Sequence, residues 1–178
     1  MQLIIFSGLP GTGKSSVAEA VGRELGTPVF AKDWLEAALL RSNLQGETGY
    51  AGYELLTVLA QRQLSLGQSA ILDSVASFAR IRVQWRWLAI DYGAAWRVVE
   101  CVCSDPAQHR QRVESRQRHI PGWHELTWAE VERVRGYYET WQEERLVLDA
   151  TRPLAANIQS ALIYLQGVPH ERGAHHDG

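Results

Sequence analysis

The segment from Gly8 to Ser15 constrains the structure of this chain more than any other. It runs Gly-Leu-Pro-Gly-Thr-Gly-Lys-Ser and fits G-x-x-x-x-G-K-S/T, the pattern of a phosphate-binding loop. The apolar run 3–6 before it predicts a buried strand, and apolar residues at helical spacing within 17–25 predict a helix after it. A glycine-rich turn that matched the pattern by chance would not be expected to have a strand directly before it and a helix directly after it. The segment therefore predicts a site for the phosphates of a nucleotide between a strand and a helix.

The residues of this loop have separate expected roles. Lys14 is expected to reach the β- and γ-phosphates, and the Ser15 hydroxyl is expected to be a ligand of Mg²⁺. We expect ATP and Mg²⁺ as the cofactors, although the sequence alone does not distinguish ATP from GTP. The loop residues predicted to bind the nucleotide are Gly8, Leu9, Pro10, Gly11, Thr12, Gly13, Lys14, Ser15 and Ser16.

Composition and charge describe an ordinary globular chain. Its 178 residues are 46% hydrophobic and 21% charged, which suits one domain with a real core. A net charge of −2 argues against a general binder of nucleic acid or membrane surfaces, and no apolar run has the length of a membrane span. Because Met1 leads straight into the first strand, and because Cys101 and Cys103 suit buried thiols better than a disulfide, we expect a cytoplasmic protein. The oligomeric state is left open.

Short apolar runs alternate with longer amphipathic segments along the chain. This alternation predicts an α/β fold, with a parallel sheet and crossover helices. The expected strands are about 2–7, 27–31, 69–73, 96–103 and 146–149. The expected helices are about 13–25, 34–40, 50–66, 78–92, 106–120, 127–142 and 153–165, with a capping box of Thr127 and Glu130 opening the sixth. A polar loop is expected at 42–49.

Two carboxylates follow predicted strands, and one of them narrows the class of protein. Asp33 ends the second strand region and Asp73 ends the third, at the strand edge where open α/β sheets bind ligands. Asp73 is predicted to bind Mg²⁺ or the acceptor, against the alternative of a strand-end cap. No glutamate follows Asp73, so the water-activating base of an ATPase motor is missing, and the guanine-binding motifs of a GTPase are also absent. A small kinase is the class that remains.

Several segments carry a resemblance to a known family. The stretch 3–16, Asp33, the run 71–73, the arginine-rich helix and the end 146–154 are similar to adenylate-kinase-like P-loop phosphotransferases. The most similar group comprises the AAA-type small kinases around zeta toxin, chloramphenicol phosphotransferase, gluconate kinase and phage polynucleotide kinase. The resemblance covers roughly 1–166, with a highly specific phosphate-binding loop and less specific other motifs. It implies the P-loop NTPase fold, with a five-stranded parallel sheet in the order 2-3-1-4-5 between helices.

The resemblance also implies the domain layout and further site residues. It implies one kinase domain over 1–167, with a short helical lid at about 112–126, and the polar end 168–178 is expected to be a flexible tail. Asp33 is implied as the general base, although it also fits a helix N-cap. Arg112 and Arg116 are implied as catalytic lid residues, and Arg118 and Arg152 as nucleotide contacts.

The acceptor is less well defined by the sequence than the donor. Polynucleotide kinases carry an arginine where this chain has Glu36, so a neutral or cationic acceptor is expected rather than a phosphorylated one. Trp34 is the tryptophan expected nearest to the acceptor, and Trp123 and Trp128 are candidates for its walls. The predicted function is ATP-dependent phosphate transfer to a hydroxyl of a small molecule. The alternatives are an ATP-binding regulatory or partner protein with little kinase activity, and a toxin-like kinase of a sugar nucleotide.

Overall fold

The computed structural model describes residues 1–42 and 50–167. The predicted loop 42–49, apart from Ser42, and the predicted tail 168–178 therefore lie outside the described residues. Within the described residues, no helix combines the length and the apolar character that crossing a membrane requires.

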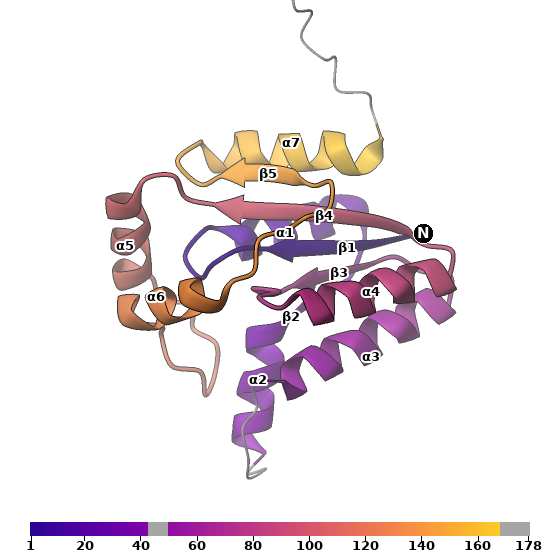
Figure 1. The fold of residues 1–178 in the computed structure, drawn as a ribbon, viewed down its shortest axis with the longest axis horizontal. Coiled ribbons are helices and arrows are strands. Elements are labelled where there is room, and N and C mark those ends of the chain that lie inside the picture. The colour runs from indigo at the N-terminus through magenta and orange to yellow at the C-terminus, as the bar shows by residue number, and fades with distance from the viewer. Residues whose placement is uncertain (43–49, 168–178) are drawn as a thin grey trace, which may run out of the picture.

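A five-stranded parallel sheet forms the centre of the molecule (Figure 1). Its strand order is β2-β3-β1-β4-β5, which confirms the fold class and the strand order expected from the sequence. The bounds are β1 Gln2–Ser7, β2 Val29–Ala31, β3 Ala70–Asp73, β4 Ala95–Val102 and β5 Leu146–Asp149. The register pairs Phe6 with Asp73 and Ser7 with Glu100, so the polar ends of three strands meet just before the phosphate-binding loop.

Helices cover both faces of the sheet, and the residues of β1 alternate between the two cores. The helices α1 (Lys14–Leu25) and α7 (Leu154–Gln166) pack on one face, where Ile4 and Phe6 are buried. The helices α3 (Ala51–Ser65) and α4 (Ala79–Asp91) pack on the other, where Leu3 and Ile5 are buried with Trp85. Because every core position of β1 is apolar, the strand reads as a continuous hydrophobic run, as is usual for a strand covered on both faces.

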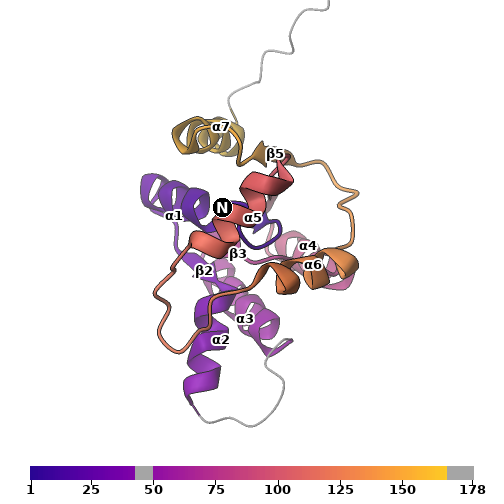
Figure 2. The same cartoon turned by 90° about the vertical axis from the view of Figure 1, so that its left-hand side faces the viewer.

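Three further helices lie around the carboxyl edge of the sheet, where the strand arrows end (Figures 1 and 2). They are α2 (Lys32–Arg41), α5 (Pro106–Ser115) and α6 (Trp128–Tyr137). The capping box of α6 is confirmed, because the Thr127 hydroxyl accepts from the Glu130 N–H while the Glu130 carboxylate accepts from the Thr127 N–H. This arrangement leaves the carboxyl edge surrounded by helix termini and loops, which can present functional side chains.

The predicted ends of α5 and α6 were wrong, and packing explains both differences. The helix α5 ends at Ser115 rather than near residue 120, and Arg116 is extended, with φ −80 and ψ 148. The only buried residues of α5 are His109 and Val113, so nothing holds a further turn against the core. The helix α6 ends at Tyr137 rather than near residue 142, because Tyr138 and Trp141 turn inward and bond the Ser7 hydroxyl.

Candidate active site

The loop between β1 and α1 has a backbone that requires glycine at its two ends. Gly8 has a φ of 135°, and a Cβ there would lie 2.1 Å from the carbonyl oxygen of Cys101. Gly13, at the N-cap of α1, has a φ of 78° and makes no side-chain cap. The Thr12 hydroxyl donates to the Leu9 carbonyl over 2.8 Å and closes the loop on itself. The N-terminal N–H groups of α1 are thus left uncapped by side chains, as an anion-binding loop requires.

A buried histidine that the sequence reasoning missed supports this loop from behind. His109 of α5 is 2% exposed, and its Nε2 lies 2.8 Å from the Pro10 carbonyl oxygen. Arg135 Nη2 lies 3.5 Å from Nδ1, so the network assigns a neutral ring that donates from Nε2 and accepts at Nδ1. Burial lowers the pKa of His109 and favours that neutral form. The signal was present in the sequence, since His109 and Val113 are four residues apart on the inward face of α5.

The glycine loop and the predicted lid arginines line one cavity of about 430 Å³, called here the donor cavity. Lys14, Ser15 and Ser16 form its floor at the start of α1. The structure also brings Arg112, Arg116 and Arg118 to it, from the end of α5 and the extended segment that follows. Its complete lining is Gly11, Gly13, Lys14, Ser15, Ser16, Arg112, Ser115, Arg116, Gln117 and Arg118. Cationic groups from two separate parts of the chain therefore face the phosphate-binding loop.

The arginines differ in how their guanidinium groups are engaged. Arg112 donates from Nη2 to the Ala150 carbonyl over 2.7 Å, which ties α5 to the end of β5. Arg116 has a buried Nε and a buried Nη2 that find no hydrogen-bond partner among the described residues, and burial lowers its pKa. Arg152 is exposed and is not among the residues that line the donor cavity. The nearest carboxylate to Arg116 is that of Glu125, with 4.0 Å between Nε and Oε2, and Arg118 Nη2 is likewise buried without a partner among the described residues. Arg116 and Arg118 therefore have hydrogen-bond donors available for a ligand, and Arg116 has the larger number.

Asp73 lies at the floor of the site beside Lys14. Its Oδ1 is 4.0 Å from Lys14 Nζ and has no hydrogen-bond partner among the described residues. Burial raises the pKa of Asp73, and Lys14 and the Ser15 hydroxyl oppose that rise. No three His, Cys, Asp or Glu side chains of residues 1–42 and 50–167 come together to hold a metal alone. Mg²⁺ usually takes only one or two protein ligands beside phosphate oxygens, so the orphaned Asp73 carboxylate with Ser15 fits that ion.

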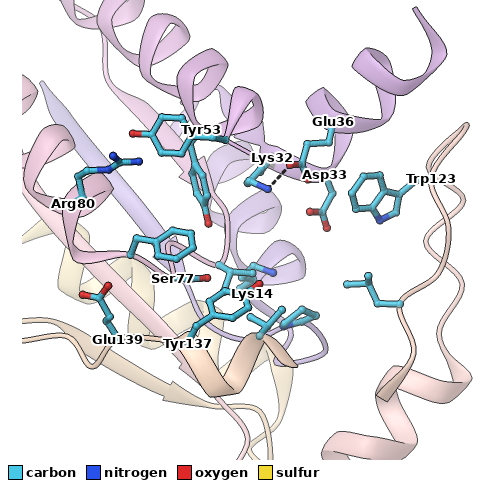
Figure 3. Close-up of a pocket in the computed structure, with 16 residues that line it drawn as sticks. Lys14, Lys32, Asp33, Glu36, Tyr53, Ser77, Arg80, Trp123, Tyr137 and Glu139 are labelled. Atoms are coloured by element: carbon cyan, nitrogen blue, oxygen red, sulfur yellow. Dashed lines mark hydrogen bonds and ion pairs between the residues drawn. The ribbon is translucent and has the colours of Figure 1, made fainter. Parts of the chain in front are cut away.

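A second cavity of about 550 Å³ adjoins the first, and we call it the acceptor cavity. Lys14 lines both cavities, so they meet at its side chain. Figure 3 shows Asp33 and Trp123 on one side of it, and Arg80 and Glu139 on the other. Its complete lining is Pro10, Lys14, Lys32, Asp33, Glu36, Tyr50, Tyr53, Val75, Ser77, Phe78, Arg80, Trp123, Leu126, Val134, Tyr137 and Glu139.

Asp33 lies in the first turn of α2 and faces this cavity. The alternative that it caps the helix is wrong, because Ala31 occupies the N-cap position and no side chain caps α2. Arg118 Nη1 donates to Asp33 Oδ2, and Arg118 also bonds Glu125. Burial raises the pKa of Asp33, but Lys14 and Arg118 together outweigh burial and hold that pKa below its ordinary value. Asp33 is therefore a carboxylate at neutral pH, in contact with the segment that carries the lid arginines.

The other residues predicted near the acceptor divide into those inside and those outside the cavity. Glu36 lines it but is buried against Lys32, with 2.5 Å between the Lys32 Nζ and its Oε1. Trp123 lines it as expected. Trp34 is 48% exposed and does not line it, and Trp128 instead packs edge-on against His109 with 5.1 Å between ring centroids. The placement of Trp34 and Trp128 near an acceptor was thus wrong, because their helices turn them elsewhere.

The sequence reasoning also missed most of the acceptor cavity's wall. The missed residues include four aromatic side chains and one carboxylate: Tyr50, Tyr53, Phe78, Tyr137 and Glu139. They come from α3, the β3–α4 connection and the end of α6, far apart in the sequence. The sequence held a local signal only for the connection that follows Asp73, because open α/β sheets bind ligands at the carboxyl ends of their strands.

Comparisons with known proteins agree with this architecture. A family described as "AAA domain" matches residues 3–140. No curated protein matches the sequence.

A sugar kinase from a Janibacter species has a TM-score of 0.70 at 18% identity, covering 95% of this chain and 96% of that one. An APS kinase from Mycobacterium tuberculosis in complex with AMPPNP and APS has a TM-score of 0.65 at 22% identity, covering 93% and 97%. Kti12 from Chaetomium thermophilum in complex with ADP-AlF3 has a TM-score of 0.71 at 17% identity, covering 93% and 97%. At these identities the structural likeness concerns the fold, which is that of the P-loop small-kinase group.

Proposed function

The chain belongs to the AAA domain family, and we propose that it is an ATP-dependent phosphotransferase acting on a hydroxyl group of a small molecule. The observation that carries the proposal is that Lys14 lines both cavities. A γ-phosphate held by Lys14 in the donor cavity would therefore face the acceptor cavity, in whose wall Asp33 lies. Such a layout suits transfer to a second substrate better than hydrolysis, since no glutamate follows Asp73 to activate water.

On the donor side, this chain's residues would bind and neutralise the phosphates. The glycine loop offers backbone N–H groups, Lys14 offers its ammonium, and Arg116 offers its unpartnered guanidinium donors. Mg²⁺ held by Ser15 and Asp73 would supply further neutralisation of the phosphate charge. The lid is proposed at about 112–126, within a single kinase domain over 1–167, and its closure would exclude water.

On the acceptor side, Asp33 would take the proton of the attacking hydroxyl. The lowered pKa keeps Asp33 ionised at neutral pH, and Arg118 occupies only its Oδ2. The second oxygen is left to accept a hydrogen bond from the hydroxyl and then its proton as the new phosphate ester bond forms. Arg118 would hold Asp33 in place while it does so. The proposed partner is thus a small molecule that enters the acceptor cavity.

The test compares acceptor-dependent ATP consumption by the wild type and by Asp33→Asn across nucleosides, sugars, aminoglycosides and aryl alcohols. We expect turnover with at least one class, and a loss in kcat on the order of 100-fold in the variant. Asp91→Asn is the matched control, because Asp91 is an exposed carboxylate at the end of α4. An acceptor that Asp33→Asn phosphorylates at the full rate would show that Asp33 is not the base.

A second function is favoured by one observation, the ion pair that engages Asp33. A base held by Arg118 also suits a nucleotide-binding regulatory protein whose segment after α5 docks on α2. In that case AMPPNP would bind tightly, no acceptor would stimulate ATP consumption, and Arg118→Gln would change partner binding rather than turnover. Acceptor-dependent turnover decides between the two functions.

A further inference from the structure

The acceptor cavity has an aromatic wall that phosphate transfer alone does not require. Five of its lining side chains are aromatic, and four more are aliphatic or proline: Tyr50, Tyr53, Phe78, Trp123, Tyr137, Pro10, Val75, Leu126 and Val134. The rings of Phe78 and Tyr137 are parallel, with 5.5 Å between centroids and 7° between planes. Tyr53 meets Phe78 edge-on at 6.5 Å, so the rings form a connected wall. Flat apolar surfaces of this kind bind flat apolar ligands.

The rings of this wall are left partly open rather than packed away. Phe78 is 39% exposed and Tyr137 is 44% exposed, although both line a concave cavity. An apolar ring open to water inside a cavity gains free energy when a ligand covers it. Tyr53, by contrast, is buried and supports Phe78 from behind. Tyr50 is similarly exposed, at 37%, but the Arg80 guanidinium lies over its ring. Phe78 and Tyr137 are therefore the exposed rings of the wall without a charged group over them that a bound molecule would cover.

One cation that lines the cavity, Arg80, has no carboxylate partner among the described residues, whereas Lys32 is already paired. Lys32 is paired with Glu36, and its Nζ lies 4.7 Å from the centre of the Tyr53 ring. The Arg80 guanidinium lies over the Tyr50 ring at 4.5 Å. On the proposed function, Lys14 is taken by the donor phosphates, Lys32 pairs with Glu36 and Arg118 pairs with Asp33, so Arg80 and Glu139 remain and the wall is close to neutral. The γ-phosphate would add negative charge beside Asp33, and an acceptor with its own anion would be repelled by it.

Several polar groups of the wall are already engaged, which makes the wall a weaker fit for a polyhydroxylated sugar than for an apolar ring. Ser77 is the only uncharged, non-aromatic polar side chain in the described lining, and it already interacts with the Tyr53 hydroxyl. Glu139 accepts from the Ala79 N–H with its Oε2 at the start of α4. A sugar bound here would have to compete with these contacts for hydrogen-bond partners and would leave the apolar rings uncovered.

From these observations, and resting on the proposed function, we infer that the acceptor is an alcohol with a flat aromatic body and no negative charge. Its ring would lie against Phe78 and Tyr137, and its hydroxyl would point to Asp33 and Lys14. The transferred phosphate would leave ADP and bond to the hydroxyl oxygen, whose proton goes to Asp33. A cavity of about 550 Å³ accommodates a molecule of two or more fused rings.

The test uses four hydroxylated probes with naphthyl glycol as the reference. The decahydronaphthyl counterpart has saturated rings, naphthyl hydroxyacetate has a carboxylate in place of the terminal CH2OH group, and glucose has no aromatic body. Binding is measured by ligand-observed NMR titration with AMPPNP present, and phosphate transfer is measured separately with ATP. We expect naphthyl glycol to bind about tenfold more tightly than the decahydronaphthyl compound, because stacking adds to apolar burial. Naphthyl hydroxyacetate, which adds a carboxylate, is expected to bind at least about tenfold more weakly than naphthyl glycol.

Two variants locate the binding to the aromatic wall. Phe78→Leu and Tyr137→Leu remove partly exposed rings without opening the core, and each should abolish most of the preference for the aromatic probe. Trp87→Leu is the control, because Trp87 is 60% exposed on α4 and does not line the cavity. An aromatic preference that both wall variants retain would overturn the inference, and so would a naphthyl glycol that fails to bind at millimolar concentration.

The experiment separates this inference from the function on which it rests. Transfer to glucose in preference to naphthyl glycol would overturn the aromatic acceptor and leave the phosphotransferase intact. Naphthyl glycol that binds against the wall but receives no phosphate would support the aromatic ligand and overturn the transfer reaction. Tighter binding of naphthyl hydroxyacetate than of naphthyl glycol would overturn the charge argument.

Discussion

The donor cavity and the acceptor cavity meet at Lys14 but are built in different ways. The donor cavity is made by a glycine-rich backbone, a helix N-terminus and cationic side chains with unpartnered donors. The acceptor cavity is made by aromatic and aliphatic side chains, and its charged groups include the paired Lys32, Glu36 and Asp33. The first is suited to phosphates in general, whereas the surface of the second would select one kind of molecule. Neutralisation of the phosphate charge would depend on the first, and the choice of acceptor and its deprotonation by Asp33 would depend on the second.

The largest effect is expected at the residue that the two cavities share. Lys14→Ala should lower kcat about 100- to 1,000-fold, because it removes the cation placed where charge develops during transfer. Steady-state kinetics with a saturating acceptor measures the loss. Thermal unfolding provides the control, since the variant must be folded. A kcat of Lys14→Ala within a few-fold of the wild-type kcat would show that Lys14 does not stabilise the transferred phosphate, and the proposed donor and acceptor roles of the two cavities would be wrong.

Two of the three donor-side arginines, Arg112 and Arg116, should respond in opposite ways. Arg116→Ala should lower kcat about 100-fold with little loss of stability, because two of its buried donors have no hydrogen-bond partner among the described residues and its ion pair with the part-exposed Glu125 is long, at 4.0 Å. Arg112→Ala should instead cost about 1–2 kcal/mol of folding free energy, because it breaks the bond to the Ala150 carbonyl. Turnover and urea denaturation are measured on both variants. A reversed pattern would exchange the roles of Arg112 and Arg116.

This contrast also shows how far the sequence could go. The glycine loop and Asp73 were predictable because their chemistry follows directly from a strand that the sequence marks. The five strands were predictable for the same reason, since buried parallel strands are continuous apolar runs. Their order was implied by the family resemblance, not by the runs themselves. The sequence placed Arg116 on the same helix as Arg112, but α5 ends at Ser115. The length of α5 depends on packing against the core, and only His109 and Val113 of this helix are buried.

The acceptor cavity was hidden from the sequence because no one segment contains it. Its wall combines α2, α3, the β3–α4 connection and the chain around α6. Tyr53 and Tyr137 each occur in an amphipathic helix, where an aromatic residue usually belongs to the core. Only tertiary packing decides that Tyr53 is buried while Tyr137 is open to the cavity. Contacts between distant segments, rather than local patterns, therefore set specificity here.

A smaller effect is expected where α5 supports the donor cavity from behind. His109→Leu should weaken AMPPNP binding about tenfold, because the Pro10 carbonyl loses the donor that fixes the loop. Calorimetric titration measures the affinity, with His124→Leu as the control on an exposed histidine. An unchanged affinity would show that the loop holds its conformation without α5.

The same histidine gives a pH dependence whose sign can be worked out. Burial lowers the pKa of His109 in the folded chain below its ordinary value of 6.5. Its contribution to stability is therefore present above pH 6.5 and is lost as the pH falls through the lower, folded pKa. Unfolding free energies measured from pH 7.5 down to about pH 5 should decline more steeply in the wild type than in His109→Gln. Equal slopes would mean that other groups govern acid sensitivity.

The smallest effects are expected at two tryptophans, and they sharpen the boundary of the acceptor cavity. Trp34→Ala should leave both the unfolding free energy and the acceptor KM nearly unchanged, since Trp34 is half exposed and lies outside the cavity. Trp123→Ala should raise the acceptor KM several-fold, because it removes wall area beside Asp33. A larger effect on the acceptor KM at Trp34 than at Trp123 would mean that the acceptor also contacts the outer face of α2, where Trp34 lies.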